Sequence, residues 1–321
     1  MDRPDHTLLE AVDARTKLAG SNRMEILLFS LGTGETFGIN VFKVREVMRT
    51  PPITSAPDMP AAVKGMVSLR GALVPVVDLA DYIGMQPDSP REIMIVTEYN
   101  GKTQGFLVES VDTILRLDWS QMRVPPQMLT SNLGGLVTAV TELPDGCLVM
   151  MLDVERVLAE TDKVDDAMIF SGISSLGRDD LTILFADDSS VARGQIERTL
   201  EVLGLRHISA VNGRAAWDEL QRIATLAETS GKHVKDYVQL VLTDVEMPEM
   251  DGYLLTKNIK ADSRFAGIPV IMHSSLSSMS NQQLGRSVGV DEYVPKFEPH
   301  RLAETLGRLL LNRKPANALA N

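Results

Sequence analysis

From Leu181 onward, short continuous apolar runs alternate with segments that have the spacing of amphipathic helices. The apolar runs are LTILFA, RHISAV, VQLVLTD, IPVIMHS and EYVPK. Strands that are apolar on both faces belong to parallel sheets covered by helices on both sides. The alternation therefore predicts a doubly wound, flavodoxin-like α/β domain with a five-stranded parallel sheet, whose site lies at the carboxyl ends of the strands.

Acidic and polar side chains follow these runs where they end. Asp187 and Asp188 come directly after the first run, and Asp244 ends the third. Ser274 ends the fourth run and Lys296 ends the fifth. Each residue alone has a plainer explanation, since paired aspartates often cap helices and a lysine is often a solvated charge. Because the ends of parallel strands meet at one edge, we expect the five side chains to lie together.

Three of these carboxylates are suited to a magnesium ion. Mg²⁺ prefers carboxylate oxygens and water in octahedral geometry. Asp188 and Asp244 are candidate ligands, and Asp187 can orient a bound water. The backbone carbonyl of Glu246 can complete the shell. The sequence therefore predicts a Mg²⁺ site at this edge of the sheet.

The remaining side chains suit a phosphoryl group. The hydroxyl of Ser274 and the ammonium of Lys296 can each contact a phosphoryl oxygen. With the metal and the lysine stabilising the spread charge, Asp244 becomes an activated nucleophile that forms an acyl phosphate. The sequence thus favours phosphoryl acceptance on Asp244.

The motifs ILFADDS, LTDVEMPEMDG, MHSS and DEYVPKF resemble those of the response-regulator receiver family over roughly residues 181–312. The resemblance implies that Asp244 receives its phosphoryl group from a phosphohistidine on a partner kinase. It also implies that Ser274 and Tyr293 are switch residues.

The sequence departs from the receiver pattern in two places. Family members usually have Lys-Pro with a cis bond at the fifth strand, whereas here Pro295 precedes Lys296 and Phe297 follows it. Residues 224–237 read as an insertion in a helix–strand connection. Neither departure removes a functional side chain.

Residues 24–158 consist of short strand candidates separated by turn signals, which predicts an all-β module. EILLFSL and ETFGINV form a predicted hairpin across Gly32–Gly34, and IMIVTEY and TQGFLVESV form another across Asn100–Gly101. LVTAVTEL and CLVMMLDV form a third across Pro144–Gly146.

A weak repeat lies inside this module. LVPVVDLADYI and LVMMLDVERVL each have a strand, an aspartate and a helical apolar pattern, with the aspartates at Asp78 and Asp153. We expect both to cap the following helix rather than to form a catalytic acid pair. The repeat predicts two similar β-subdomains, each closed by a short helix. Since residues 24–160 contain no nucleophile–base pair, metal cluster or phosphate-binding glycine loop, binding is favoured over catalysis.

The segments FGINVFKVREVM and VKGMVSLRGALVPVVDL resemble the CheW family of chemotaxis coupling proteins. The resemblance implies two small SH3-like β-barrels that link chemoreceptor tips to the CheA histidine kinase. It also places Val44, Glu46, Gly65 and Arg70 at positions that contact receptor or kinase. An internal ion pair of Arg70 that braces the two barrels is equally favoured, and Val44 on its apolar strand is more often a core residue.

A receiver behind a CheW-like module resembles the CheV-type coupling proteins. The predicted organisation is an N-terminal arm (1–22), a coupling domain (23–160), a linker (161–180), a receiver (181–312) and a C-terminal tail (313–321). The expected function is an adaptor that couples chemoreceptors to a CheA-type kinase and is modulated by phosphorylation of Asp244. The alternative is a phosphate sink that drains the kinase.

Composition excludes several other classes. The net charge of −11 argues against nucleic acid as a partner. The single cysteine, Cys147, excludes an internal disulfide and fits a reducing compartment. The polar N-terminus does not resemble a signal peptide, and no apolar run approaches the ~20 residues that span a bilayer. We therefore expect a cytoplasmic protein that is recruited to membrane chemoreceptor arrays without inserting into the membrane.

Overall fold

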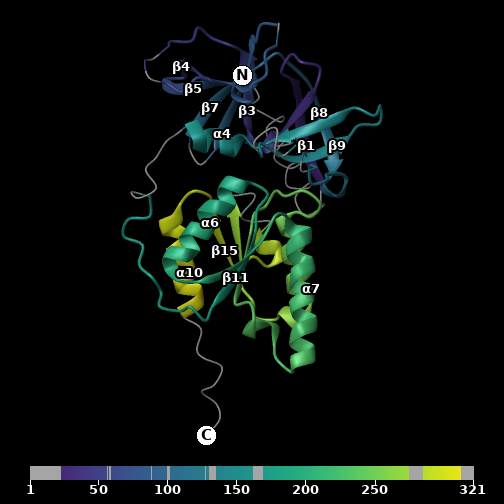
Figure 1. The fold of residues 1–321 in the computed structure, drawn as a ribbon, viewed down its shortest axis with the longest axis vertical. Helices are drawn as coiled ribbons and strands as arrows, with labels where there is room; N and C mark the ends of the chain where they lie inside the picture. The colour runs from purple at the N-terminus through teal and green to yellow at the C-terminus, as the bar shows by residue number, and fades with distance from the viewer. Residues whose placement is uncertain are drawn as a thin grey trace, which may run out of the picture. The chain divides into compact units, whose positions relative to one another are not determined.

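The computed structural model describes residues 23–311 except for 56, 58, 88, 100–101, 127, 130–134, 162–168 and 275–284. These residues form two compact units, one before and one after the gap at 162–168 (Figure 1). The predicted arm and tail lie outside the described residues, as do part of the predicted linker and the Asn100–Gly101 turn. No helix in the described part of the chain has the length and apolar character to cross a membrane.

The N-terminal unit contains two five-stranded sheets. The strands of the first, in spatial order, are β8 (Ser110–Asp118), β1 (Arg23–Ser30), β2 (Thr36–Asn40), β10 (Leu148–Leu152) and β9 (Val137–Glu142). The strands of the second are β3 (Val44–Arg49), β6 (Ile93–Tyr99), β7 (Lys102–Val108), β5 (Ala72–Asp78) and β4 (Val63–Leu69). The three predicted hairpins are present as the antiparallel pairs β1–β2, β6–β7 and β9–β10.

The two sheets have the same spatial arrangement of strand pairs, although the order of the strands along the chain differs. Each has two antiparallel hairpins joined by one parallel pair, β2–β10 in the first sheet and β7–β5 in the second. Each also closes on itself through an isolated antiparallel bridge, Arg123–Val140 in the first and Thr54–Met66 in the second. The repeat seen in the sequence therefore reflects two small β-barrels of one design, as predicted.

A short helix follows the repeated strand of each barrel. Asp78 caps α2 (Leu79–Tyr82) by accepting a hydrogen bond from the backbone N–H of Asp81 at 3.2 Å. Asp153 accepts one from the N–H of Arg156 at 3.0 Å at the start of α4 (Val154–Thr161). The capping interpretation of these two aspartates is confirmed. Apolar residues of both sheets and both helices form a shared core.

The C-terminal unit is an all-parallel five-stranded sheet. Its strands, in spatial order, are β12 (Arg206–Ala210), β11 (Thr182–Ala186), β13 (Leu240–Thr243), β14 (Val270–Ser274) and β15 (Glu292–Pro295). The helices that cover it are α6 (Ser190–Leu203), α7 (Gly213–Ser230), α8 (Gly252–Ala261) and α10 (Pro299–Leu311). This is the predicted doubly wound fold.

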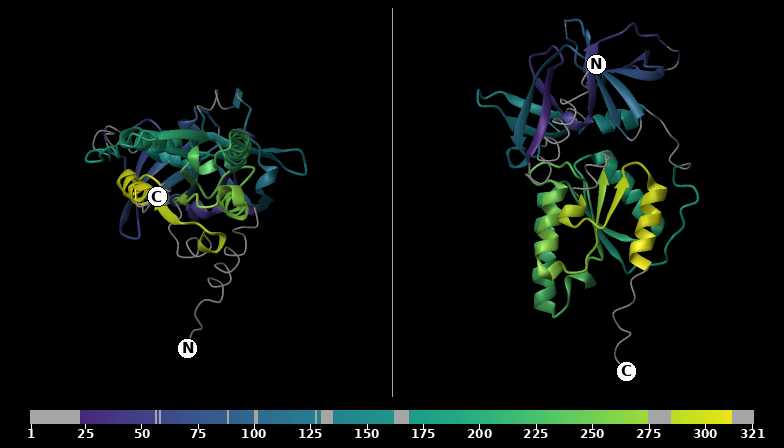
Figure 2. Two further views of the ribbon diagram at one scale, coloured as in Figure 1. Left: turned by 90° about the horizontal axis from the view of Figure 1, so that it is seen from below. Right: turned by 180° about the vertical axis from the view of Figure 1, so that it is seen from behind.

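Alternate residues of the buried strands face opposite sides of this sheet. On β11, Leu184 belongs to the core under α7 and α8, while Ile183 and Phe185 belong to the core under α6 and α10. Figure 2 shows these helix pairs on the two sides of the strands. Continuous apolar strands are what a sheet covered on both faces requires.

Two connecting segments are more ordered than a plain loop. The proposed insertion at 224–237 mostly lengthens α7, which continues to Ser230 before a turn and η3 (Val234–Asp236). The end of the predicted linker packs on the receiver, because Ile173 and Leu176 contact the core under α6 and α10.

Candidate functional site

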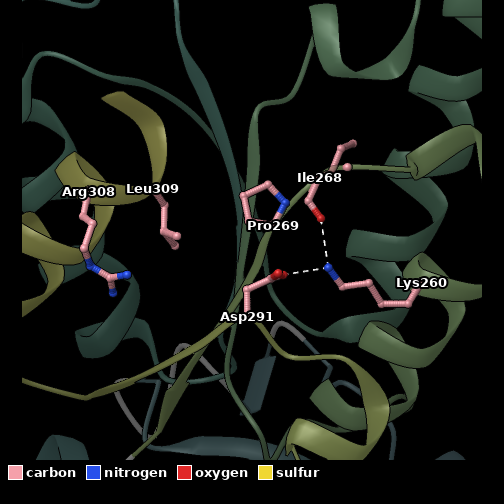
Figure 3. Close-up of a pocket in the computed structure, with 7 residues that line it drawn as sticks. Lys260, Ile268, Pro269, Asp291, Arg308 and Leu309 are labelled. Carbon is pink, nitrogen blue, oxygen red and sulfur yellow. Dashed lines mark hydrogen bonds and ion pairs between the residues drawn. The ribbon is translucent and has the colours of Figure 1, made fainter. Parts of the chain in front are cut away.

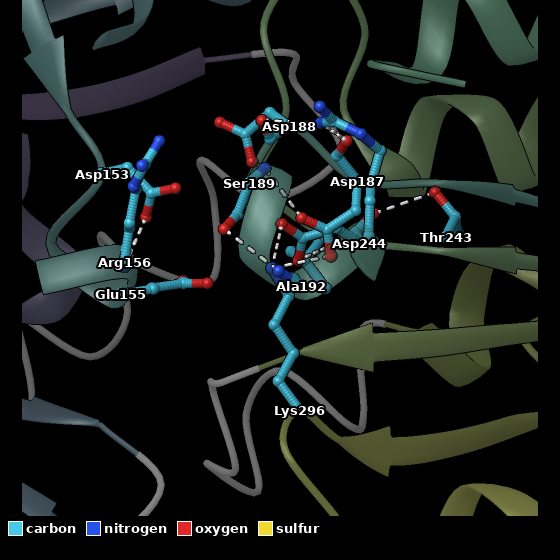
Figure 4. Close-up of polar contacts among 12 residues, drawn as sticks. Asp153, Glu155, Arg156, Asp187, Asp188, Ser189, Ala192, Thr243, Asp244 and Lys296 are labelled. Atoms are coloured by element: carbon cyan, nitrogen blue, oxygen red, sulfur yellow. Dashed lines mark hydrogen bonds and ion pairs between the residues drawn. The ribbon is translucent and has the colours of Figure 1, made fainter. Parts of the chain in front are cut away.

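Three aspartates converge at the carboxyl edge of the parallel sheet (Figure 4). Ligating oxygens of Asp187, Asp188 and Asp244 all lie within 4.8 Å of one another. Asp187 and Asp244 are buried, and Asp188 is partly exposed. The structure thus brings together carboxylates from two segments of the chain, one at 187–188 and the other at 244.

The strand pairing explains this convergence. The N–H of Asp244 donates to the carbonyl of Ala186 at 2.8 Å, which aligns the ends of β13 and β11. The cap of α6 is Ser189, whose side chain accepts from the N–H of Ala192 at 3.3 Å. Asp187 accepts instead from the N–H of Ser189 at 2.9 Å. Because the serine caps the helix, helix capping does not explain the paired aspartates.

Lys296 lies among these carboxylates. Its Nζ is 2.9 Å from Oδ2 of Asp187 and 2.8 Å from Oδ2 of Asp244, and the residue is fully buried. A buried ammonium is costly unless it is paired and hydrogen-bonded. Two carboxylates satisfy that requirement here, and the ammonium in turn lowers their mutual repulsion.

The backbone around Lys296 differs from the usual Lys-Pro pattern. The N–H of Lys296 donates to the carbonyl of Ser274 at 3.1 Å, which continues the β14–β15 pairing. The next residue, Phe297, has a φ of +60°, and the described residues contain no cis peptide bond. The lysine therefore reaches the carboxylates without the Lys-Pro step.

Arg193 and Gly252 shape the backbone around the cluster. Nη1 of Arg193, on α6, donates to the carbonyls of Asp187 and Asp188 at 2.8 and 2.9 Å. A Cβ at Gly252 would lie 2.0 Å from the carbonyl oxygen of Asp244, so only glycine fits. The sequence interpretation missed Arg193; its position in the first turn of the helix after Asp188 was the available signal.

The donor set fits a hard dication. Three carboxylates supply the oxygen ligands that Mg²⁺ prefers, and they already lie close enough to share one ion. Glu246, expected to contribute its backbone carbonyl, is partly buried in the loop that follows β13. Among the described residues, the group of candidate ligand atoms contains no atom of the Glu246 side chain, and the contribution of its backbone carbonyl stays a prediction.

Ser274 and Tyr293 lie on the two strands beyond Asp244. Ser274 ends β14 and is 3% exposed. Tyr293, on β15, has its hydroxyl 2.9 Å from that of Tyr253 on α8. Burial raises the pKa of Tyr293; the hydrogen bond from Tyr253 offsets part of this rise, and the charge of Asp244 adds to it. Tyr253 was not singled out from the sequence, because its position in the chain gives no sign that its hydroxyl would lie beside that of Tyr293.

A hollow lies at the opposite edge of the same sheet (Figure 3). Pro269 and Asp291, which precede β14 and β15, line it together with Lys260. Nζ of Lys260 pairs with Oδ2 of Asp291 at 2.6 Å. Ligands of open α/β sheets bind at the carboxyl ends of the strands, so this hollow is not the candidate site.

The four candidate coupling residues all belong to the barrel that contains β3 and β4. Glu46 and Arg70 form an ion pair at 2.9 Å, between β3 and the β4–β5 turn. The pair therefore lies within one barrel, and the alternative in which Arg70 braces the two barrels is wrong. Arg70 has a 70% exposed side chain and a φ of +50°. An exposed ion pair held on a strained turn remains accessible to a partner.

Val44 and Gly65 have structural explanations in the same barrel. Val44 is partly buried and packs against the core shared by the two barrels. Gly65 has a φ of +141°, and a Cβ there would lie 2.3 Å from the carbonyl oxygen of Thr54. Glycine is therefore needed where the barrel closes through the Thr54–Met66 bridge.

Comparison with known proteins agrees with this division. Residues 25–162 match the CheW-like domain family, and residues 183–306 match the response regulator receiver domain family. The chain is 32% identical to chemotaxis protein CheV3 of Helicobacter pylori, over 85% of this chain and 88% of that protein. It is 26% identical to CheV1 of the same organism, over 94% and 98%. A probable chemotaxis protein CheW of Rhizobium etli is 31% identical over 43% of this chain and 89% of its own length.

Proposed function

Because the chain belongs to the CheV family of chemotaxis proteins, we propose that it couples chemoreceptors to a CheA-type histidine kinase and that phosphorylation of Asp244 modulates the coupling. The CheW-like domain is the coupling module, and the receiver is its input. The observation that carries the proposal is the contact of Lys296 with Asp244 and Asp187 at the carboxyl edge of the sheet.

Phosphoryl transfer to Asp244 proceeds by in-line displacement. A carboxylate oxygen of Asp244 attacks the phosphorus of an N-phosphohistidine on the kinase. The new P–O bond forms as the P–N bond breaks, and the electron pair of that bond returns to the imidazole nitrogen. The products are an acyl phosphate and a free histidine, so no other co-reactant is needed.

The side chains around Asp244 have distinct roles in this step. The ammonium of Lys296, 2.8 Å from Asp244 Oδ2, is placed to contact a phosphoryl oxygen as charge develops. The hydroxyl of Ser274 is the second such contact. Arg193 holds the backbone of Asp187 and Asp188 through its two carbonyl contacts.

The carboxylates of Asp187, Asp188 and Asp244 and the carbonyl of Glu246 would hold Mg²⁺. When bound, the ion neutralises phosphoryl charge and aligns the reacting oxygens. We expect the acyl phosphate to be lost by hydrolysis, so that the protein returns to its starting state and acts as an adaptor rather than as an enzyme.

The coupling surface is proposed to include Val44, Glu46, Gly65 and Arg70. Glu46 and Arg70 are the members that a receptor or kinase would contact directly, since their ion pair is accessible. Val44 and Gly65 support this surface through core packing and barrel closure. Through this surface the protein would be recruited to membrane chemoreceptor arrays.

A phosphate sink is the second candidate function, since a receiver that accepts and hydrolyses phosphoryl groups drains its kinase. An Asp244→Asn protein separates the two functions in a reconstituted receptor–kinase mixture. If phosphorylation modulates coupling, this variant alters the response of kinase activity to receptor ligand. If the protein is a sink, coupling and its response are unchanged while phosphorylated kinase accumulates.

A further inference from the structure

Tyr253, which is buried, and Tyr293, which is half-buried, form a hydroxyl pair on neighbouring elements of the receiver. Their hydroxyl oxygens are 2.9 Å apart, and either can donate to the other. Tyr253 is 3% exposed, and Tyr293 packs with it against Val245 and Met272 in a small apolar cluster. A tyrosine hydroxyl in such a place requires a hydrogen-bond partner, and each hydroxyl supplies one to the other.

The ring of Tyr293 fits into this position because a glycine faces it. A Cβ at Gly285 would lie 2.3 Å from Cε2 of Tyr293 and 3.0 Å from its hydroxyl. The absence of that atom leaves the space that the ring fills. The burial of Tyr293 thus depends on shape at Gly285 and on the hydroxyl contact at Tyr253.

Tyr253 is also joined to the phosphoacceptor strand through its preceding residue. Gly252 approaches the carbonyl of Asp244 so closely that a Cβ there would lie 2.0 Å from it. The N–H of Gly252 donates to the carbonyl of Val245 at 2.9 Å, which ties the start of α8 to the residue after Asp244. A shift of the Asp244 backbone would therefore displace Gly252 and, with it, the neighbouring Tyr253.

We propose that Tyr253 is a positioning residue for Tyr293, whose ring it holds in the half-buried, inward orientation by a hydroxyl–hydroxyl hydrogen bond. The contact involves neither a phosphoryl group nor a metal, so it biases Tyr293 inward already in the unphosphorylated receiver. The inference rests on the proposed function in one respect, namely that the orientation of Tyr293 is what the receiver changes. Phosphorylation then acts on an equilibrium between inward and outward orientations of the Tyr293 ring that Tyr253 has already shifted toward the inward one.

Burial at this site also affects the acidity of both phenols. Desolvation raises the pKa of Tyr253, and the neighbouring Tyr293 raises it further. Both phenols are therefore neutral at physiological pH, and one neutral hydroxyl can donate to the other. Nitration by tetranitromethane requires an accessible phenol that can ionise, so its rate at Tyr293 reports how often the ring turns outward.

The test is the rate of Tyr293 nitration in the full-length protein, measured by peptide mass spectrometry without kinase, phosphoryl donor or Mg²⁺. Tyr253→Phe keeps the ring and removes the hydroxyl. Loss of one net hydrogen bond should raise the Tyr293 rate about two- to tenfold. Tyr253→Leu, which also lacks the hydroxyl, should raise it as well. Cooperative urea unfolding identifies the variants that retain the fold.

Two further variants make the result decisive. Tyr237→Phe removes a hydroxyl that lies 2.8 Å from that of Ser230, elsewhere in the same unit, and should leave the Tyr293 rate unchanged. Gly285→Ala should raise the rate by filling the space of the ring, which shows that the assay detects an outward ring. An unchanged rate in the folded Tyr253 variants, alongside a raised rate in Gly285→Ala, overturns the proposal. Since the assay contains no phosphoryl donor, that failure would leave phosphorylation of Asp244 untouched.

Discussion

The ammonium of Lys296 lies 2.8 Å from Oδ2 of Asp244, although the two residues are 52 positions apart. Both side chains are buried at the carboxyl edge of the receiver sheet. The carboxylate proposed as nucleophile and the cation proposed to stabilise its transition state are thus in contact before any reaction. The lysine also contacts Asp187 at 2.9 Å, so it links the acceptor to the proposed metal site.

Replacing Lys296 should impair phosphorylation strongly. Lys296→Met keeps most of the side-chain volume but removes the charge that faces the phosphoryl oxygens. We expect labelling of Asp244 by phosphorylated kinase to slow by roughly a hundredfold, the typical effect of losing one such transition-state contact. Lys260→Met, at the opposite edge of the sheet, is the matched control. A Lys296→Met protein labelled at the control rate would remove the lysine from the mechanism.

Magnesium should stabilise the folded receiver. At a Mg²⁺ concentration about 100-fold above the dissociation constant, a single site raises the free energy of unfolding by about 2.7 kcal/mol. Asp188→Asn should abolish most of this gain, because it removes one of the three clustered carboxylates. Urea unfolding with and without Mg²⁺ measures the effect. Equal stabilisation of Asp188→Asn and the unaltered protein would place the ion elsewhere.

Gly252→Ala should destabilise the receiver, because the new Cβ would lie 2.0 Å from the carbonyl oxygen of Asp244. The cost of such overpacking is about 1–3 kcal/mol in the free energy of unfolding. Gly194→Ala is the matched control, since Gly194 lies within α6 and a Cβ added there would meet no atom within 4 Å. This control should gain up to about 1 kcal/mol. Similar stabilities for the two variants would contradict the packing described at Asp244.

Arg70→Ala should strongly lower receptor-stimulated kinase activity and change the free energy of unfolding only slightly. The side chain is 70% exposed, so its ion pair with Glu46 contributes at most about 1 kcal/mol to folding. If Arg70 contacts a partner, receptor-stimulated kinase activity should fall severalfold. Arg45→Ala is the control, because it breaks an exposed ion pair between β3 and Glu98. Equal activity of the two variants would remove Arg70 from the coupling surface.

The order and type of the receiver elements follow from local pattern and could be read from the sequence. The rule that parallel strands present their carboxyl ends at one edge was enough to predict that Asp187, Asp188, Asp244 and Lys296 lie close together. The repeat around Asp78 and Asp153 likewise indicated two barrels of one design. In these cases spacing along the chain carries the information.

Contacts that depend on packing between elements were not accessible in this way. The reach of Arg193 to two carbonyls and the pairing of Tyr253 with Tyr293 depend on side-chain orientations that the tertiary fold sets. An ion pair of Arg70 could be expected, but the sequence did not show that its partner lies in the same barrel. The secondary structure of residues 224–237 could not be predicted either, since an extended helix and an inserted loop have similar local sequence patterns.

The central claim is that Asp244 is the phosphoacceptor, and phosphotransfer tests it most directly. A CheA-type kinase carrying a radiolabelled phosphohistidine is mixed with the full-length protein, and the labelled residue is mapped. The account predicts Mg²⁺-dependent label on Asp244 that is lost in Asp244→Asn and retained in Asp153→Asn, which alters a helix cap in the coupling domain. Label that persists in Asp244→Asn, or no Mg²⁺-dependent label on the unaltered protein, would contradict it.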